Sequence, residues 1–170
     1  MKNKLIVCAV AMGIFSFNAS ANGQGVVNFK GSVIDAPCSI AVDSADQTID
    51  FGQISKAHLE ASGISAKKDL DIKLLNCTTT TLSSVSVAFS GATEQGNTKE
   101  LATAGGTGTA IVISEPGGDN VGFDNTKGGD RILQDGDTTL RYSTWVKKAN
   151  GATLAEGAFT AVANFSLSYQ

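Results

Sequence analysis

The chain has 170 residues, of which 42% are hydrophobic and 17% are charged, and this balance predicts one folded domain, with or without a short appendage. The formal net charge of −3 argues against nucleic acid as a main partner, because binding to phosphates needs a basic surface. One histidine and three cysteines leave little material for a metal site.

The first 21 residues are predicted to be a secretory signal peptide. Lys2 and Lys4 form a short basic region, residues 5–17 are an apolar run, and residues 19–21 (Ala-Ser-Ala) have the small side chains of a cleavage site. The apolar run is too short for a membrane-spanning helix, which needs about 20 residues. Cleavage would leave residues 22–170 with eleven basic and sixteen acidic side chains, a formal charge of −5.

The predicted export signal also affects how the three cysteines are interpreted. Cleavage removes Cys8 and leaves Cys38 and Cys77, and a single pair in an exported protein is expected to form a disulfide. The alternative, two buried free thiols, is disfavoured by the export signal. The loop closed by the bridge, about 40 residues long, predicts on the order of 4 kcal/mol of stabilisation.

The rest of the chain has the pattern of β-structure, because short apolar alternations recur between Gly, Asn, Asp and Ser. Strands are expected over residues 27–33, 48–51, 70–74, 85–89, 109–113, 140–146 and 158–169. Only residues 55–62 look helical, with Ser55 as a cap and Gly63 as a stop. Asn150-Gly151 indicates a turn within a longer hairpin loop between the last two strands. Many short strands predict an all-β sandwich.

Three features that could suggest chemistry have simpler interpretations. The glycine-rich residues 105–108 precede a predicted strand, whereas a phosphate loop leads into a helix, so a flexible turn is expected. Asp135 and Asp137 lack the later ligands of a calcium loop and are expected at a polar hairpin tip. His58 has no second histidine or suitable cysteine and is expected to be solvated or partly packed. The sequence therefore predicts no catalytic residue, no metal ligand and no cofactor.

The C-terminal residues alternate strictly. Every odd position from 159 to 169 is apolar, and the even positions are mostly small or polar. This pattern predicts one long strand with one buried face, running to the end of the chain. Because chain ends usually fray, such a strand is expected to be held by something. The apolar positions are Phe159, Ala161, Ala163, Phe165, Leu167 and Tyr169.

Residues 22–31 alternate in a similar way. The glycines among them would allow another backbone to approach closely. The pattern alone is also that of an ordinary first strand of the same sandwich. One face of the segment would carry Gly23, Gly25, Val27, Phe29 and Gly31.

Several segments and two positional marks together form a familiar pattern. Gly157 stands fourteenth from the C-terminus, and Tyr169 stands next to last. The segments are residues 25–33 (Gly-x-Val-x-Phe-x-Gly-x-Val), 35–40 (Asp-Ala-Pro-Cys-Ser-Ile), 49–55 (Ile-Asp-Phe-Gly-Gln-Ile-Ser), 70–77 (Leu-Asp-Ile-x-Leu-x-Asn-Cys) and the C-terminal residues 156–170. From residue 23 to residue 170, the chain resembles the chaperone–usher fimbrial pilins of type 1 and P-type pili, and in particular the major shaft subunits of P-type pili.

The resemblance implies an incomplete immunoglobulin-like β-sandwich that lacks its last strand and so has an open hydrophobic groove. It implies that a periplasmic chaperone fills the groove with a strand of its own. At the outer-membrane usher, the N-terminal extension of the next subunit then replaces that strand. The implied organisation is a signal peptide over residues 1–21, a donor-strand extension over 22–31 and a pilin domain over 32–170. Gly157 and the apolar positions up to Tyr169 would border the groove.

The implied function is that of a structural subunit of a bacterial surface pilus, polymerising head to tail by donor-strand exchange. Its partners would be other copies of itself, related pilins, the periplasmic chaperone and the outer-membrane usher, without nucleic acid. The alternatives are a minor adaptor or terminator pilin, or an adhesive binding module. Family adhesins carry an additional receptor-binding domain ahead of the pilin domain, whereas only residues 22–31 precede the pilin-like core here, which favours the shaft.

Overall fold

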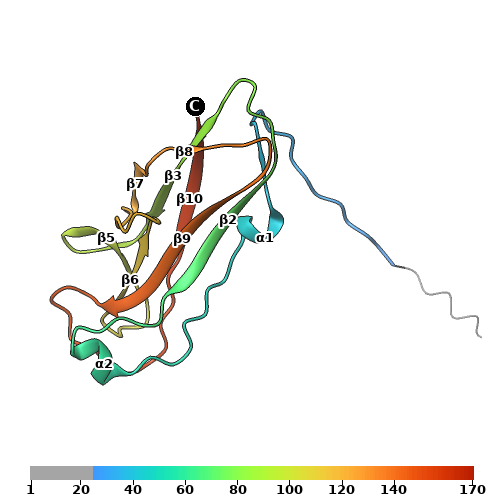
Figure 1. The fold of residues 1–170 in the computed structure, drawn as a ribbon. Coiled ribbons are helices and arrows are strands. Elements are labelled where there is room, and N and C mark those ends of the chain that lie inside the picture. Colours follow the sequence, from blue (N-terminus) through green and yellow to red (C-terminus); the bar gives the residue numbers. More distant parts are fainter. Residues whose placement is uncertain (1–24) are drawn as a thin grey trace, which may run out of the picture. The chain divides into compact units, whose positions relative to one another are not determined.

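The computed structural model describes residues 25–170, as an N-terminal segment of residues 25–34 and a compact unit of residues 35–170 (Figure 1). The predicted signal peptide, residues 1–21, lies outside the described residues. The N-terminal segment is exposed throughout and contains no helix or strand. The strand expected over residues 27–33 is therefore absent, because no neighbouring strand pairs with its backbone.

The compact unit contains two antiparallel sheets (Figure 1). The strands are β1 (Ser39–Ile40), β2 (Lys68–Cys77), β3 (Ser84–Gly91), β4 (Thr93–Glu94), β5 (Asn97–Ala102), β6 (Thr109–Ser114), β7 (Asp124–Lys127), β8 (Arg131–Ile132), β9 (Gly136–Lys148) and β10 (Ala163–Tyr169). The larger sheet has the order β1-β2-β9-β6-β5-β4, and the smaller has the order β10-β3-β7, with β8 also paired to β3. The predicted all-β sandwich is confirmed.

The core lies between the sheets and is built from the inward face of each strand. The strands predicted over residues 70–74, 85–89, 109–113 and 140–146 all form. Residues 140–146 alternate and bury one face, whereas residues 85–89 are buried on both faces. Phe89 of β3 meets Tyr142 of β9 edge to face, with ring centroids 5.2 Å apart. Burial, the main cause, raises the pKa of Tyr142 to about 12. A smaller second cluster, the side core, contains Leu59, Val146 and Leu154.

Two short helices occur, α1 (Val42–Ala45) and α2 (Lys56–Glu60). The predicted helix is confirmed in α2, where the Ser55 Oγ accepts a hydrogen bond from the His58 N–H at 3.4 Å. Ser62 adopts a left-handed φ of 63°, and the Gly63 N–H donates to the His58 carbonyl oxygen, which ends the helix. The His58 ring is exposed, as predicted, with Nε2 lying 2.9 Å from the Ile64 carbonyl oxygen.

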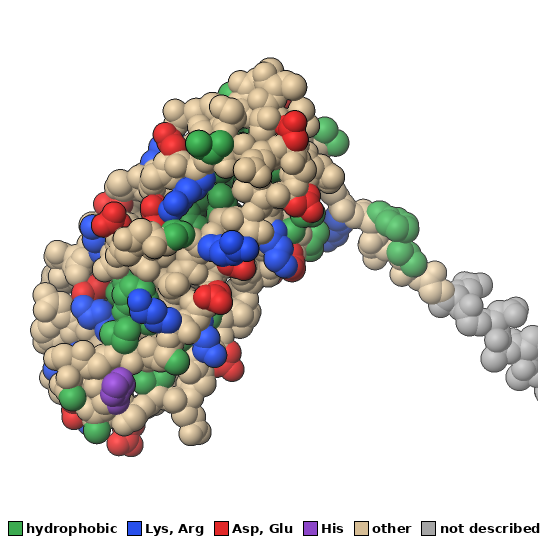
Figure 2. Space-filling view, in the orientation of Figure 1, with side chains coloured by type: hydrophobic (Ala, Val, Ile, Leu, Met, Phe, Trp, Pro, Cys, Tyr) green, Lys and Arg blue, Asp and Glu red, His purple; other side chains and the backbone are tan. Residues whose placement is uncertain are grey.

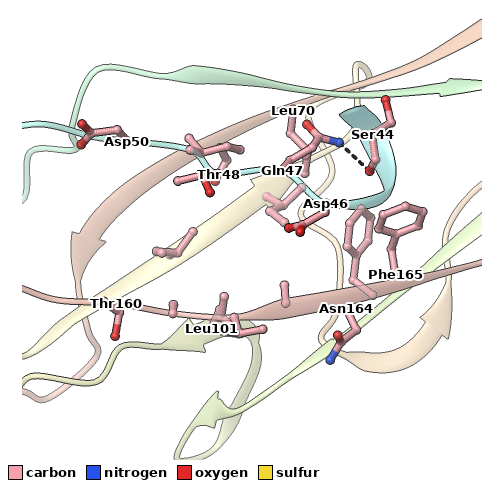
Figure 3. Close-up of a pocket in the computed structure, with 18 of the residues that line it drawn as sticks. Ser44, Asp46, Gln47, Thr48, Asp50, Leu70, Leu101, Thr160, Asn164 and Phe165 are labelled. Atoms are coloured by element: carbon pink, nitrogen blue, oxygen red, sulfur yellow. Dashed lines mark hydrogen bonds between the residues drawn. The ribbon is translucent and has the colours of Figure 1, made fainter. Parts of the chain in front are cut away.

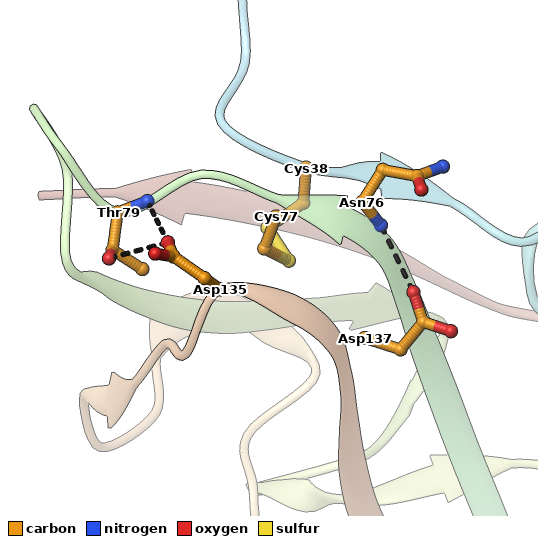
Figure 4. The surroundings of a disulfide bond; sticks show 6 residues. All are labelled: Cys38, Asn76, Cys77, Thr79, Asp135 and Asp137. Atoms are coloured by element: carbon orange, nitrogen blue, oxygen red, sulfur yellow. Dashed lines mark hydrogen bonds between the residues drawn. A yellow bond between two sulfur atoms is a disulfide. The ribbon is translucent and has the colours of Figure 1, made fainter.

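The predicted disulfide between Cys38 and Cys77 is present and joins the residue before β1 to the end of β2 (Figure 4). The prediction that Asp135 and Asp137 form a hairpin tip is wrong. The Asp135 Oδ1 accepts hydrogen bonds from the Thr79 N–H and Oγ1, both at 2.8 Å, and these bonds lower the pKa of Asp135.

Asp137 acts similarly, because its Oδ1 accepts a hydrogen bond from the Asn76 N–H at 3.1 Å (Figure 4). The start of β9 is therefore fastened to the end of β2 next to the disulfide. Sequence reasoning missed this arrangement because it depends on which two strands are neighbours.

The predicted hairpin loop around Asn150-Gly151 is also wrong. A turn does form there, with the Ala152 N–H donating to the Ala149 carbonyl oxygen at 3.1 Å. However, β9 and β10 belong to different sheets, so residues 149–162 cross from one sheet to the other. Within residues 25–170, no helix has both the length and the apolar character needed to cross a membrane.

Candidate functional site

A groove with a volume of about 910 Å³ runs along the free edge of β10 (Figure 3). We call residues 44–51 its first rim and residues 159–165 its second rim. Its floor contains core side chains of both sheets, including Phe89, Leu101 and Ile113. The groove is therefore an opening through which the apolar core of the sandwich reaches the surface.

The two rims run in opposite directions. Phe51 of the first rim and Phe159 of the second rim both pack against the side core, so they mark one end of the groove. Ile40, just before the first rim, and Phe165 of the second rim both pack against the main core at the other end. Figure 3 shows the same arrangement, with Asp50 and Thr160 toward one end of the groove and Phe165 toward the other.

Both rims have backbone without a strand partner. The β10 strand pairs with β3 from Ala163 to Tyr169 and has no second neighbour in its sheet. On the first rim, residues 46–51 form no backbone–backbone hydrogen bond with any described residue. Exposed strand edges of this kind are ready templates for pairing with another strand.

The missing partner explains why the strand predicted over residues 48–51 is wrong. The side chains of Ile49 and Phe51 are half-buried, while those of Thr48 and Asp50 are exposed, so the alternation of a strand is present. No neighbouring backbone completes the ladder, and a strand is defined by that ladder.

The second rim shows the same effect. The strand predicted over residues 158–169 is shorter than expected, because only residues 163–169 pair with β3 and Thr160 forms an isolated bridge to Ala104. Gly157, two residues before the rim, has a φ of 149°, a value that side-chain-bearing residues rarely adopt.

The face predicted to be buried is only half-buried. Each odd position of the alternation packs on one side against the core and is open on the other, whereas the even positions before Ser168 are exposed. The half-buried positions are Phe159, Ala161, Ala163, Phe165, Leu167 and Tyr169. Partial burial raises the pKa of the Tyr169 hydroxyl. An amphipathic strand whose apolar face stays half open is a surface that another apolar strand can cover.

The predicted donor positions lie in the N-terminal segment, and the described ones are all exposed. Phe29 is 90% exposed and Val27 is 73% exposed, and the apolar character of the segment is visible in Figure 2. Apart from the adjacent residues, no atom lies within 4 Å of the position that a Cβ would occupy at Gly25 or Gly31. Gly23 lies outside the described residues.

The charged side chains of the compact unit are spread over its surface, and two of them line the groove. Within residues 25–170, no group of three or more His, Cys, Asp or Glu side chains is placed to hold a metal ion. Lysine, arginine, aspartate and glutamate side chains are interspersed over the face shown in Figure 2. The charged residues that line the groove are Asp46 and Asp50, both on the first rim. Sequence reasoning found the second rim from its alternation but assigned no role to the first rim.

A model of the fimbrial protein family matches residues 27–170. The chain belongs to this family. The Pap fimbrial major pilin protein of Escherichia coli is 48% identical over the whole of both chains. Fimbria A protein of Serratia marcescens is 41% identical, and the match covers 99% of this chain and 98% of that one.

Solved structures agree with the family. This fimbrial protein superposes on the crystal structure of the P pilus rod subunit with a TM-score of 0.76 and 50% identity, covering 79% of this chain and 100% of that one. A chaperone–usher pilus structure gives a TM-score of 0.82 and 51% identity, and the match covers 87% of this chain and 96% of that one. The predicted resemblance to chaperone–usher pilins and the pilin-type β-sandwich are therefore confirmed, and the family is one of structural pilus proteins.

Proposed function

We propose that this fimbrial protein is the major shaft subunit of a chaperone–usher pilus and that it polymerises by donor-strand exchange. Residues 22–31 of one copy, continued to Val33, would lie as a strand in the groove of another copy. The observation that carries the proposal is the half-open apolar face of the second rim, between two backbone edges without partners. The 48% identity to a protein named as a major pilin supports the shaft role.

The sizes of the side chains support this assignment. On the second rim, two large residues, Phe159 and Phe165, flank two small ones, Ala161 and Ala163, so the groove has room in its middle. The donor segment has the opposite order, with Gly25 and Gly31 flanking Val27 and Phe29. Both patterns span six residue steps, and a strand adds the same rise at every step. The two bulky donor side chains would therefore fill the space left by the two alanines.

Antiparallel pairing with β10 gives the more stable hydrogen-bond ladder. In that direction Gly31 lies opposite Phe159, and Phe29 lies opposite Ala161. Val33, which is 104% exposed in the chain by itself, then continues the alternation past Phe159 toward Gly157. Each bulky apolar side chain that becomes buried contributes about 1.5–3 kcal/mol, and each new backbone hydrogen bond contributes about 0.5–1.5 kcal/mol.

The proposal includes a route to the cell surface. Residues 1–21 would direct export and be removed, and a periplasmic chaperone would cover the groove until the usher exchanges the chaperone strand for the next subunit. Such a chaperone is needed because an open apolar groove with unpaired edges promotes aggregation. The head-to-tail contact does not close on itself, so repetition gives a filament.

The experiment is gel electrophoresis in SDS of material sheared from the cell surface, unheated and boiled. Wild-type protein is expected to give a ladder of oligomers that boiling converts to monomer. Replacing both bulky donor residues, Val27→Ser and Phe29→Ser, should abolish the ladder while chaperone-bound monomer persists in the periplasm. The matched control carries Val26→Ser and Asn28→Ser, at the outward positions, and should keep the ladder. A ladder that survives the first pair of substitutions would refute donor-strand exchange through this segment.

A further inference from the structure

We propose that Lys30 of the donated strand forms an ion pair with Asp50 on the first rim of the receiving copy, and that this pair helps to fix the direction of insertion. The inference rests on the proposed function. It assigns a partner to Lys30, which takes no part in the apolar contacts of the donor strand. Lys30 is the one charged residue of segment 25–34. The charged residues that line the groove are both acidic, Asp46 and Asp50.

The alternation of the two strands places Lys30 and Asp50 on the same side. In the donor, the odd positions point into the groove, so Lys30 points outward to solvent. On the first rim, Ile49 and Phe51 point inward and are half-buried, whereas Asp50 is exposed. Both charged side chains would therefore stand on the outer face of the completed sheet, where neighbouring strands bring opposite side chains within reach.

The position of each donor residue along the groove can be inferred from the residues that mark the two ends of the groove. Phe51 and Phe159 mark the same end, because both pack against the side core. A donor antiparallel to β10 places Gly31 at the level of these two phenylalanines. Such a donor runs parallel to the first rim, so the residue before Gly31 lies beside the residue before Phe51. Lys30 therefore comes to the level of Asp50, which lies toward that end of the groove in Figure 3.

The opposite direction gives a different pair. A donor parallel to β10 satisfies the size pattern equally well, because Gly25 and Gly31 exchange places. Lys30 then comes to the level of Asp46, near Phe165 in Figure 3. The carboxylate with which Lys30 pairs therefore distinguishes the two directions of the donor strand, and Asp46 serves as a matched control for Asp50.

The hydrogen bonds of Asp50 leave it able to accept a new partner. Its Oδ1 accepts a hydrogen bond from the Gly52 N–H at 2.8 Å, which supports the turn where Gly52 has a left-handed φ of 62°. Its Oδ2 makes no hydrogen bond or ion pair with any residue in the range 25–170. Asp50→Asn keeps an oxygen for the Gly52 N–H and removes only the charge, so the turn is expected to remain.

The test uses the full mature chain with Val27→Ser and Phe29→Ser, so that its own extension does not compete. It is refolded with a fluorescent synthetic peptide of residues 22–34, and peptide dissociation is measured by displacement with unlabelled peptide. The peptide variant Lys30→Glu should dissociate about 1.5- to fivefold faster, the range for exposed charge pairs on a sheet. Asp50→Asn in the chain should remove most of this difference, and Asp46→Asn should leave it unchanged.

Salt provides a second readout, because exposed ion pairs are screened. The difference between the two peptides should shrink at 1 M sodium chloride, whereas the apolar contribution should not. If Asp50→Asn leaves the difference unchanged, or Asp46→Asn removes it, the proposed pair is wrong while donor-strand exchange stands. If the wild-type peptide fails to bind at all, donor-strand exchange itself is refuted.

Discussion

Phe29 is the donor residue with the most apolar surface to bury, and its truncation gives a direct measure of the groove. The side chain is 90% exposed in the chain by itself and would lie opposite Ala161 in the filled groove. Truncating a buried Phe to Ala costs about 3–5 kcal/mol. Because the groove is open on its outer side, we expect the lower end of this range, about 3 kcal/mol. In a domain of this size, each 1 kcal/mol shifts the melting temperature by about 2–4 °C, so Phe29→Ala should lower it by roughly 6–12 °C.

The assay needs a groove that is filled within one chain. A second copy of residues 22–34, joined after Gln170 by a short glycine–serine turn, can fold back antiparallel to β10 and fill the groove of its own domain. The substitution is made in this appended copy, and the free energy of unfolding is measured with urea by circular dichroism. The control is Asn28→Ala in the same copy, which points outward and should cost less than about 0.5 kcal/mol. A loss below about 1 kcal/mol for Phe29→Ala, or an equal loss for Asn28→Ala, would refute the reasoning.

Three further predictions concern the compact unit in this single-chain form. Replacing Cys38 by Ser should lower the free energy of unfolding by about 2–5 kcal/mol in non-reducing urea titrations, and an unchanged midpoint would contradict a stabilising role for the bridge. Ser55→Ala removes the side-chain oxygen that accepts a hydrogen bond from the His58 N–H and should lower the free energy of unfolding by about 0.5–2 kcal/mol. Ser55→Asp supplies another acceptor and should keep most of this stability. Hydrogen bonds from Thr79 lower the pKa of Asp135, so its stabilisation is present above the unfolded pKa of about 4 and is lost as the pH falls through the folded value. Asp135→Asn should therefore reduce stability at pH 7 more than at pH 3, and equal effects at both would contradict this account.

The strands that could be predicted from the sequence are those whose partners lie inside the chain. Residues 70–74, 85–89 and 140–146 alternate in sequence, have buried side chains and belong to strands with neighbours on both sides. Residues 48–51 alternate in the same way, yet no strand forms there, because no described backbone pairs with them. Alternation predicts which face of a segment prefers burial, but it does not say whether the same chain supplies the neighbour.

The candidate site could be predicted in part for the same reason. The apolar positions from Phe159 to Tyr169 were found from their period of two, and the structure places those from Phe159 to Phe165 along one rim of the groove. The alternation of residues 48–51 predicted a strand there, but the position of residues 44–51 along the groove was missed, because it depends on the path of the fold. Asp135 and Asp137 were misassigned as a hairpin tip because their true partners lie more than 50 positions earlier in the chain.

The unformed strands and the proposed filament have one physical cause. Residues 48–51 and 159–162 have the alternation of strands, and both border the same groove. One inserted strand would supply a backbone partner along the side of each segment that faces the groove. A donor strand that fills the groove therefore completes the β-sandwich of the receiving copy and also forms the contact between the two copies. Its removal would expose the apolar core and break two ladders together, so dissociation should be as slow as unfolding of the sandwich. A substitution in the donor segment that weakens its fit in the groove should therefore lower both the stability of the filament and the stability of each filled domain.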